Sequence, residues 1–229
     1  MTMKSAGKGA DFRILETDAR PIIPLEGVFW ASCRFQPGPA ARLVHEDPGG
    51  PVILDPPEDL ARAVDKRRSE FLAGRLAALL ALRAAGAPET VGRDGRAPVW
   101  PAGVRGSISH SAGRAMAVAT KSRAALGLDC ETMLTEAAAE EIAPIVLTPA
   151  DQAMKPPGWS EAAFRTAVFS AKEAVYKALS DRMSDIPDFL EASIEKADAD
   201  GFEIRLRNWL ALARVAFDQG DCVALAWAD

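Results

Sequence analysis

Two long stretches with apolar residues at helical spacing, one in each half of the chain, limit what it can fold into. The first, DLARAVDKRRSEFLAGRLAALLALRAAG, covers residues 59–86, with Asp59 as the predicted N-cap and Gly86 as the stop. The second, SEAAFRTAVFSAKEAVYKAL, covers residues 160–179. Short stretches rich in β-branched and aromatic residues flank both. The pattern predicts an α+β protein with antiparallel strands and one long helix in each half.

The other expected elements follow from the same periodicities. We expect strands at 28–35, 52–54 and 124–131, a hairpin at 107–121, a helix at 135–147, and two or three antiparallel strands in 202–229. Residues 1–20 suggest a loosely tied terminus, and the Gly- and Pro-rich residues 86–106 an extended loop. The repeat of strands plus a long helix predicts two similar lobes, which we place at residues 1–122 and 123–229.

Composition restricts the class of protein and its partners. With 48% hydrophobic and 26% charged residues, the chain is typical of globular proteins rather than of disordered ones. A formal charge of −5 argues against a nucleic-acid partner, so any anion site must be a local cluster. No apolar run predicts a signal peptide or a membrane span. Cys33, Cys130 and Cys222 show no disulfide or zinc spacing, which fits a reducing cytoplasm.

Two carboxylates share one face of the strand expected at 124–131. In AALGLDCE, a period of two places Asp129 and Glu131 on the same side. A solvated strand end would explain them, and so would a hard divalent cation such as Mg²⁺, which takes oxygen ligands at about 2.1 Å. The pair alone does not decide between these interpretations.

The stretch FSAKEAVYKAL places charges within an apolar helical pattern. Glu173 and Lys177 are four residues apart and share a helix face, and Lys172 adjoins Glu173. A surface ion pair, worth about 0.3 to 0.5 kcal/mol, is one explanation. A third carboxylate beside two lysines would also suit a metal-bound pyrophosphate.

Basic residues gather on the first predicted helix, in DKRRSEFLAGR, and a histidine follows at the expected hairpin. Arg67 and Arg75 lie on that helix, and GSISH ends in Ser109 and His110. A solvated helix face and an incidental histidine would explain them. Arginine forks are equally suited to a terminal phosphate, and a turn histidine could bind a phosphate or a nucleotide sugar.

Taken in order, KRRSEFLAGR, GRDGRAPVWPAGVRGSISH, LGLDCE and FSAKEAVYKA resemble the 4′-phosphopantetheinyl transferases, in particular the single-chain group that includes the enterobactin synthetase D component. The resemblance covers residues 54 to about 179. It implies a pseudo-dimeric α+β fold with CoA in a cleft between two lobes. It also implies Mg²⁺-dependent transfer of the phosphopantetheine arm of CoA to a serine of an apo acyl or peptidyl carrier protein, with release of 3′,5′-ADP. A role in siderophore or secondary-metabolite biosynthesis and a monomeric state would follow.

The resemblance also assigns roles to individual residues. It implies that Asp129, Glu131 and Glu173 hold Mg²⁺, and that Lys172 and Lys177 stabilise charge on the phosphates. From the chemistry of the reaction, we expect Glu173 to accept the serine proton, directly or through a metal-bound water. The residues expected near the adenosine 3′-phosphate, on the side of the first lobe, are Arg67, Arg75, Arg96, Ser109 and His110. Phe169 and Leu128 stand where the family usually has Trp and Ile, and both changes keep apolar packing.

Two rival functions use the same residues. A Mg²⁺-dependent hydrolase of a nucleotide pyrophosphate would consume CoA without a carrier, and a CoA-binding scaffold would use the carboxylates only in ion pairs. The proline-bounded residues 140–159 are a candidate docking surface for the carrier, and a plain connecting loop explains them equally well.

Overall fold

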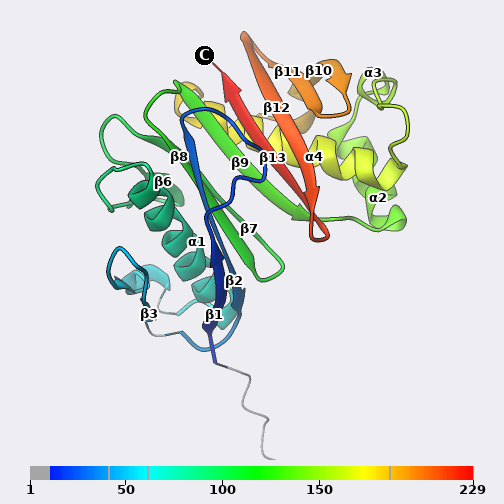
Figure 1. Ribbon diagram of the computed structural model, residues 1–229. Coiled ribbons are helices and arrows are strands. Elements are labelled where there is room, and N and C mark those ends of the chain that lie inside the picture. The colour runs from blue at the N-terminus through cyan, green and yellow to red at the C-terminus, as the bar shows by residue number, and fades with distance from the viewer. Residues whose placement is uncertain (1–10, 41, 61, 186, 229) are drawn as a thin grey trace, which may run out of the picture.

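The computed structural model describes residues 11–40, 42–60, 62–185 and 187–228, and these build two large antiparallel sheets and two two-stranded ones (Figure 1). The first sheet has the order β1-β2-β8-β7, and the second has the order β10-β11-β12-β13-β9. The strands of the first are β1 Arg13–Asp18, β2 Val28–Gln36, β7 Arg105–Ser111 and β8 Arg114–Thr120. Those of the second are β9 Ala125–Thr132, β10 Ala192–Asp198, β11 Gly201–Leu206, β12 Trp209–Asp218 and β13 Asp221–Ala228.

Each sheet carries one long helix on its outer face, so the predicted α+β class is confirmed (Figure 1). Helix α1, Asp65–Ala84, covers the first sheet, and α4, Glu161–Leu179, covers the second. The smaller elements are β3 Leu43–His45, β4 Val52–Leu54, η1 Glu58–Leu60, β5 Gly92–Asp94, β6 Ala97–Val99, α2 Glu136–Val146, α3 Pro149–Gln152, η2 Ser180–Arg182 and η3 Phe189–Glu191. The first sheet ends at Thr120 and the second begins at Ala125. The division into lobes at residues 122 and 123 stays a prediction.

Three of the local expectations were wrong. The first helix begins at Asp65, because Val64 is extended (ψ 151°), and Asp59 lies in η1, where it accepts a hydrogen bond from Arg93 at 2.6 Å. Residues 13–18 form β1 instead of a loose end, while residues 1–10 lie outside the described residues. The expected loop at 86–106 contains the hairpin of β5 and β6. β1 and β10 exist through pairing with a neighbouring strand, which local periodicity does not reveal.

The two sheets pack against each other through their inner faces. This inter-sheet core contains Ile23, Trp30, Met116, Val118, Leu126, Leu128, Cys130, Val223 and Leu225. Figure 1 shows the segment between β1 and β2 crossing in front of the second sheet, and Ile23 of that segment joins the core. At about 25 cal/mol per Å² of apolar area removed from water, such a core binds the two halves firmly.

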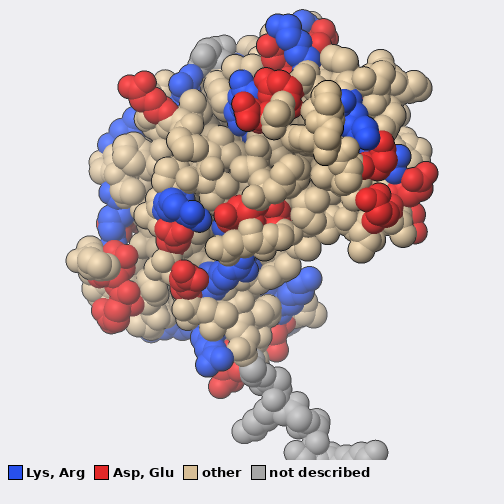
Figure 2. Space-filling view, turned by 45° about the vertical axis from the view of Figure 1, so that its right-hand side comes forward, with Lys and Arg blue, Asp and Glu red and all other residues tan. Residues whose placement is uncertain are grey.

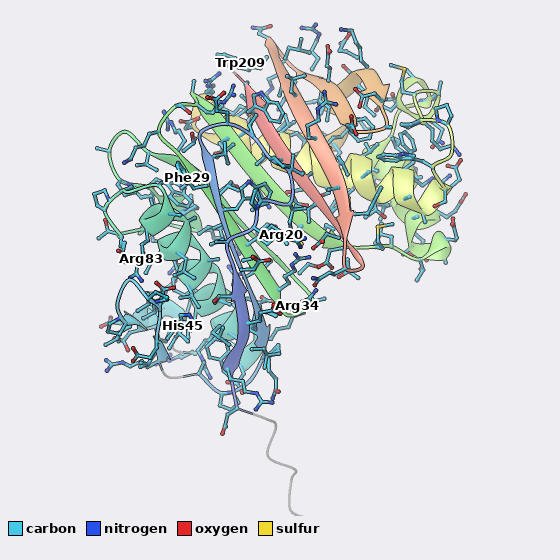
Figure 3. The ribbon with its side chains drawn as sticks, viewed as in Figure 1. Arg20, Phe29, Arg34, His45, Arg83 and Trp209 are labelled. Atoms are coloured by element: carbon cyan, nitrogen blue, oxygen red, sulfur yellow. The ribbon has the colours of Figure 1, made fainter. Side chains whose placement is uncertain are left out.

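A polar contact at the edge of this core also joins the two sheets. Arg114 of β8 is 5% exposed and donates to the carboxylates of Asp218, at 2.7 Å, and Asp221, at 3.1 Å, on either side of the β12–β13 turn. Arg34 donates to Gln219 in the same turn, and Arg20 and Arg34 are labelled on this side of the molecule in Figure 3. A buried guanidinium with two carboxylate partners resists separation, because either partner alone would be left charged and desolvated.

The surface is mixed in charge, and the three cysteines form no disulfide. Acidic and basic side chains are interspersed on the face that Figure 2 shows, without a broad field of one sign. All three cysteines are buried and free. Within the described ranges, no helix is both long enough and apolar enough to cross a membrane.

Lys172 is fully buried and does not reach the carboxylates that the sequence grouped with it. Its Nζ donates to Asp151 Oδ2 at 3.1 Å, to Val146 O at 2.7 Å and to Phe189 O at 3.0 Å. Asp151 also accepts hydrogen bonds from the backbone N–H groups of Thr148 and Ile194. Burial lowers the pKa of Lys172, and the charge of Asp151 opposes that shift. The structure therefore supports a structural role for this lysine, tying α4 to α2, α3 and η3, in place of the expected phosphate contact.

We predict that Lys172→Met lowers the free energy of unfolding by about 3 to 5 kcal/mol, because it leaves the buried Asp151 carboxylate without its counter-charge. Chemical denaturation measures this loss. Lys196→Met is the matched control, since Lys196 pairs with Glu203 while its side chain is 73% exposed, and it should cost less than about 1 kcal/mol. Equal effects of the two substitutions would contradict the structural role of Lys172.

Candidate active site

A buried carboxylate with three side-chain hydrogen-bond partners projects from β9 toward α4. Asp129 is 3% exposed, and its Oδ1 accepts hydrogen bonds from Lys177 Nζ at 2.6 Å and from Ser109 Oγ at 3.1 Å. Its Oδ2 accepts a hydrogen bond from Ser170 Oγ at 2.8 Å. Residues of β7 and α4 thus surround Asp129, which the sequence had grouped with Glu173 and Lys177.

The absence of a side chain at Gly127 allows this approach. A Cβ atom at Gly127 would lie 1.9 Å from Ala174 O and 2.6 Å from Ala178 N, both in α4. Any other residue would push the strand away from the helix, and overpacking of this kind is costly. The glycine therefore brings Asp129 and Glu131 within reach of Glu173 and Lys177.

Two glutamates beside Asp129 are half-buried, and neither forms an ion pair with another residue of the described ranges. Burial, with the charges of Asp129 and Glu173, raises the pKa of Glu131 to about 7 against the pull of Lys177. Burial and the charge of Asp129 likewise raise the pKa of Glu173. The three carboxylates therefore repel one another, and a bound cation would relieve that repulsion.

The donor chemistry of this cluster fits Mg²⁺, although the side chains do not yet form a metal site. Mg²⁺ prefers carboxylate oxygens, which Asp129, Glu131 and Glu173 supply. In the part of the chain that the structure describes, no three His, Cys, Asp or Glu side chains are arranged to hold a metal ion as they stand. The cluster therefore offers the right ligands in an arrangement that a cation would have to complete.

A small basic pocket lies between α1, β7 and the β5–β6 hairpin. The pocket has a volume of about 130 Å³ and is lined by Arg67, Glu70, Phe71, Gly74, Arg75, Arg93, Arg96, Pro98, Ile108 and His110. Arg75 is 8% exposed, and its guanidinium lies over the Phe71 ring at 5.1 Å. Burial, with the nearby charge of Arg93, lowers the pKa of Arg75. Such crowded guanidinium groups favour an anion, and forked donors suit phosphate oxygens.

His110 lies at the boundary between the basic pocket and the carboxylates. Burial lowers its pKa, the charge of Glu70 opposes that shift, and the charges of Arg67 and Lys177 add to it. A neutral imidazole can donate one hydrogen bond and accept another. Its surroundings thus include groups from both lobes.

A larger cavity of about 750 Å³ adjoins the basic pocket. It is lined by residues of both lobes, including Glu173, Tyr176 and Lys177 of α4 and Trp100 before β7. Arg96, Pro98 and Ile108 line both cavities, so the two spaces are neighbours. A ligand with phosphates at one end and a long apolar arm at the other would fit this combination.

The structure brings most of the expected site residues together. The two that differ from the expectation are Ser109 and Lys172. Arg67, Arg75, Arg96 and His110 line the basic pocket, and Ser109 contacts Asp129, whereas Lys172 is held elsewhere. Ser170 was missed as a site residue, and Arg93 had been given no definite role. Ser170 lies three residues before Glu173 and seven before Lys177, so helical spacing could have placed all three on one face. Arg93 carries no such signal, since its position depends on the β5–β6 hairpin.

Comparison with known proteins matches both halves of the chain to the same family. Residues 55–120 match the model of the 4′-phosphopantetheinyl transferase N-terminal domain, and residues 125–224 match that of the 4′-phosphopantetheinyl transferase superfamily. Together the two matches span more than half of the chain.

Individual relatives agree with the family models. Enterobactin synthase component D of Salmonella typhi is 40% identical over 149 residues, which are 64% of this chain and 62% of that protein. The 4′-phosphopantetheinyl transferase Npt of Nocardia iowensis is 38% identical over 140 residues, 55% of this chain and 62% of the relative. PptT of Mycobacterium tuberculosis is 33% identical over 143 residues, 60% of this chain and 62% of its own. The matched region thus spans about three fifths of these relatives, and the chain belongs to the 4′-phosphopantetheinyl transferase superfamily.

Proposed function

We propose that this protein transfers the 4′-phosphopantetheine arm of CoA to a serine of an apo acyl or peptidyl carrier protein and releases 3′,5′-ADP. The observation that carries the proposal is the adjacency of two unlike clusters. Three carboxylates with Lys177 lie beside a pocket rich in arginine, and a cavity of about 750 Å³ adjoins both. The names of the relatives support the same activity.

In this proposal the two lobes bind different parts of CoA. Residues 1–122 bind the adenosine 3′-phosphate through Arg67, Arg75, Arg96 and His110, with Arg93 as an added partner. Residues 123–229 hold Mg²⁺ through Asp129, Glu131 and Glu173. One chain supplies both halves of the site, so we expect a monomer.

The reaction is a displacement at the β-phosphorus of CoA. The serine oxygen of the carrier forms a bond to that phosphorus, the bond to the bridging oxygen breaks, and 3′,5′-ADP leaves with the electron pair. When bound, Mg²⁺ would supply Lewis-acid stabilisation of the pyrophosphate charge. Glu173 accepts the serine proton, and its raised pKa makes the carboxylate a stronger base than an ordinary glutamate. Lys177 stabilises negative charge on the phosphates, while Asp129 and Ser109 hold its ammonium group in place.

We predict that an apo carrier protein incubated with this protein, CoA and Mg²⁺ gains one phosphopantetheine group, and that Asp129→Ala abolishes the gain. Intact-mass spectrometry of acyl and peptidyl carriers measures it. Consumption of CoA without modification of any carrier would favour a pyrophosphate hydrolase. Untouched CoA, bound with equal affinity with and without Mg²⁺, would favour a scaffold.

We predict that Glu173→Gln lowers the turnover number at least about 100-fold, because an amide cannot accept the serine proton. Binding of CoA, measured by calorimetry without metal, should change little, since the basic pocket is intact. Turnover within a few-fold of the parent would rule out Glu173 as the base.

We predict that affinity for a divalent cation rises from about pH 6 to about pH 8. Below its pKa of about 7, Glu131 holds a proton that competes with the cation, and above it the carboxylate is free. Calorimetric titration of the CoA-free protein with Mn²⁺ at several pH values checks this. Glu131→Gln should bind the ion more weakly and flatten the profile, and an equally flat profile in the parent would contradict the assignment.

A further inference from the structure

Every second residue along most of β7 is a serine whose hydroxyl contacts the backbone of β9. Ser107 Oγ donates to Leu128 O at 3.4 Å, Ser109 Oγ accepts from Cys130 N at 3.1 Å, and Ser111 Oγ accepts from Thr132 N at 3.1 Å. We call Ser107, Ser109 and Ser111 the serine ladder. β7 is the edge strand of the first sheet and β9 that of the second, so the ladder joins the two lobes.

The ladder keeps one register over its whole length. Each contact joins residues that are 21 positions apart, so the two strands run parallel without a slip. Side chains on one face of a strand recur every second residue, and so do the N–H and C=O groups on one edge of its neighbour. The pattern S-x-S-x-S therefore matches the repeat of the edge that it contacts.

The hydroxyls take the place of a missing strand. An edge strand leaves a row of N–H and C=O groups without backbone partners, and burying such groups unpaired is costly. Leu128 and Cys130 are 0% exposed, so water does not reach this part of the edge freely. The ladder provides partners for Leu128 O and for the N–H groups of Cys130 and Thr132, and it holds β9 against β7.

Side chains on the opposite face of β7 line the basic pocket. Ile108 and His110 alternate with the serines and line that pocket, while β9 carries Asp129 and Glu131. We propose that the serine ladder sets the distance between the basic pocket and the carboxylate cluster, with Ser107 and Ser111 as positioning residues. The catalytic use of that distance rests on the proposed function, and the positioning by the ladder does not.

Ser111 is the member of the ladder best suited to a test. Ser109 also contacts Asp129 and Lys177, so its loss would disturb the site directly. Ser111 is half-exposed, and its hydroxyl contacts only Thr132, through the backbone N–H and the side-chain Oγ1 at 3.0 Å, among the hydrogen bonds assigned in the described chain. A threonine at this position would keep the hydroxyl.

The first test is amide hydrogen exchange of the intact protein, followed by NMR. Ser111→Ala should speed exchange at the Thr132 amide about fivefold, the loss expected for one hydrogen bond, and Ser111→Thr should restore the parent rate. The amide of Leu76 in α1 should not change, and Ser193→Ala, at a half-exposed serine of β10, should leave both amides as in the parent. Unchanged exchange at Thr132, or an equal rise at Leu76, would contradict the proposed role of the serine ladder.

The second test measures Mn²⁺ affinity of the CoA-free protein. Ser111→Ala should weaken Mn²⁺ binding about fivefold, Ser111→Thr should restore it, and metal-free binding of CoA should stay within twofold of the parent. Faster exchange with unchanged Mn²⁺ affinity would overturn the positioning role. Absence of carrier modification by the parent would count against the proposed function alone, because the exchange and Mn²⁺ measurements do not depend on turnover.

Discussion

The site depends on how closely β9 lies against α4. At Gly127 the strand approaches the helix backbone so closely that even a methyl group would overlap Ala174 O. Two and four residues further along, the carboxylates of Asp129 and Glu131 reach the helix face that carries Glu173 and Lys177. Without that contact the charged residues of strand and helix would belong to separate surfaces.

The same strand also holds the two halves of the molecule together. Leu126, Leu128 and Cys130 face the inter-sheet core, while the outer edge of β9 bonds to the serine ladder. Beside the Ser111–Thr132 end of the ladder, Arg114 joins the first sheet to the β12–β13 turn. A ligand that spans both lobes therefore meets two surfaces whose separation is set by packing and by hydrogen bonds, and pre-organisation of this kind lowers the cost of binding.

The buried Lys172–Asp151 pair is balanced in charge, whereas groups of like charge lie close together around the cavities. Lys172 and Asp151 neutralise each other in the interior, and their remaining hydrogen bonds go to backbone groups. By contrast, Glu131 and Glu173 share a single nearby lysine, and Arg75 and Arg93 repel each other in the basic pocket. Excess negative charge thus lies next to excess positive charge, an arrangement complementary to a cation and phosphates bound together.

The sequence by itself determined the features that depend on local periodicity. Both long helices, the β7–β8 hairpin and the common face of Asp129 and Glu131 follow from repeats of 3.6 and two residues, which hold in any environment. The four-residue spacing of Glu173 and Lys177 placed them on one side of α4 for the same reason. Tertiary structure decided which residues each side of α4 contacts. Lys172 and Lys177 differ by about 140° around the helix, so packing buried one against Asp151 and turned the other toward Asp129. The β1 strand, the place of Arg93 and the bonds of the serine ladder depend likewise on contacts between residues distant in the chain, which no local pattern records.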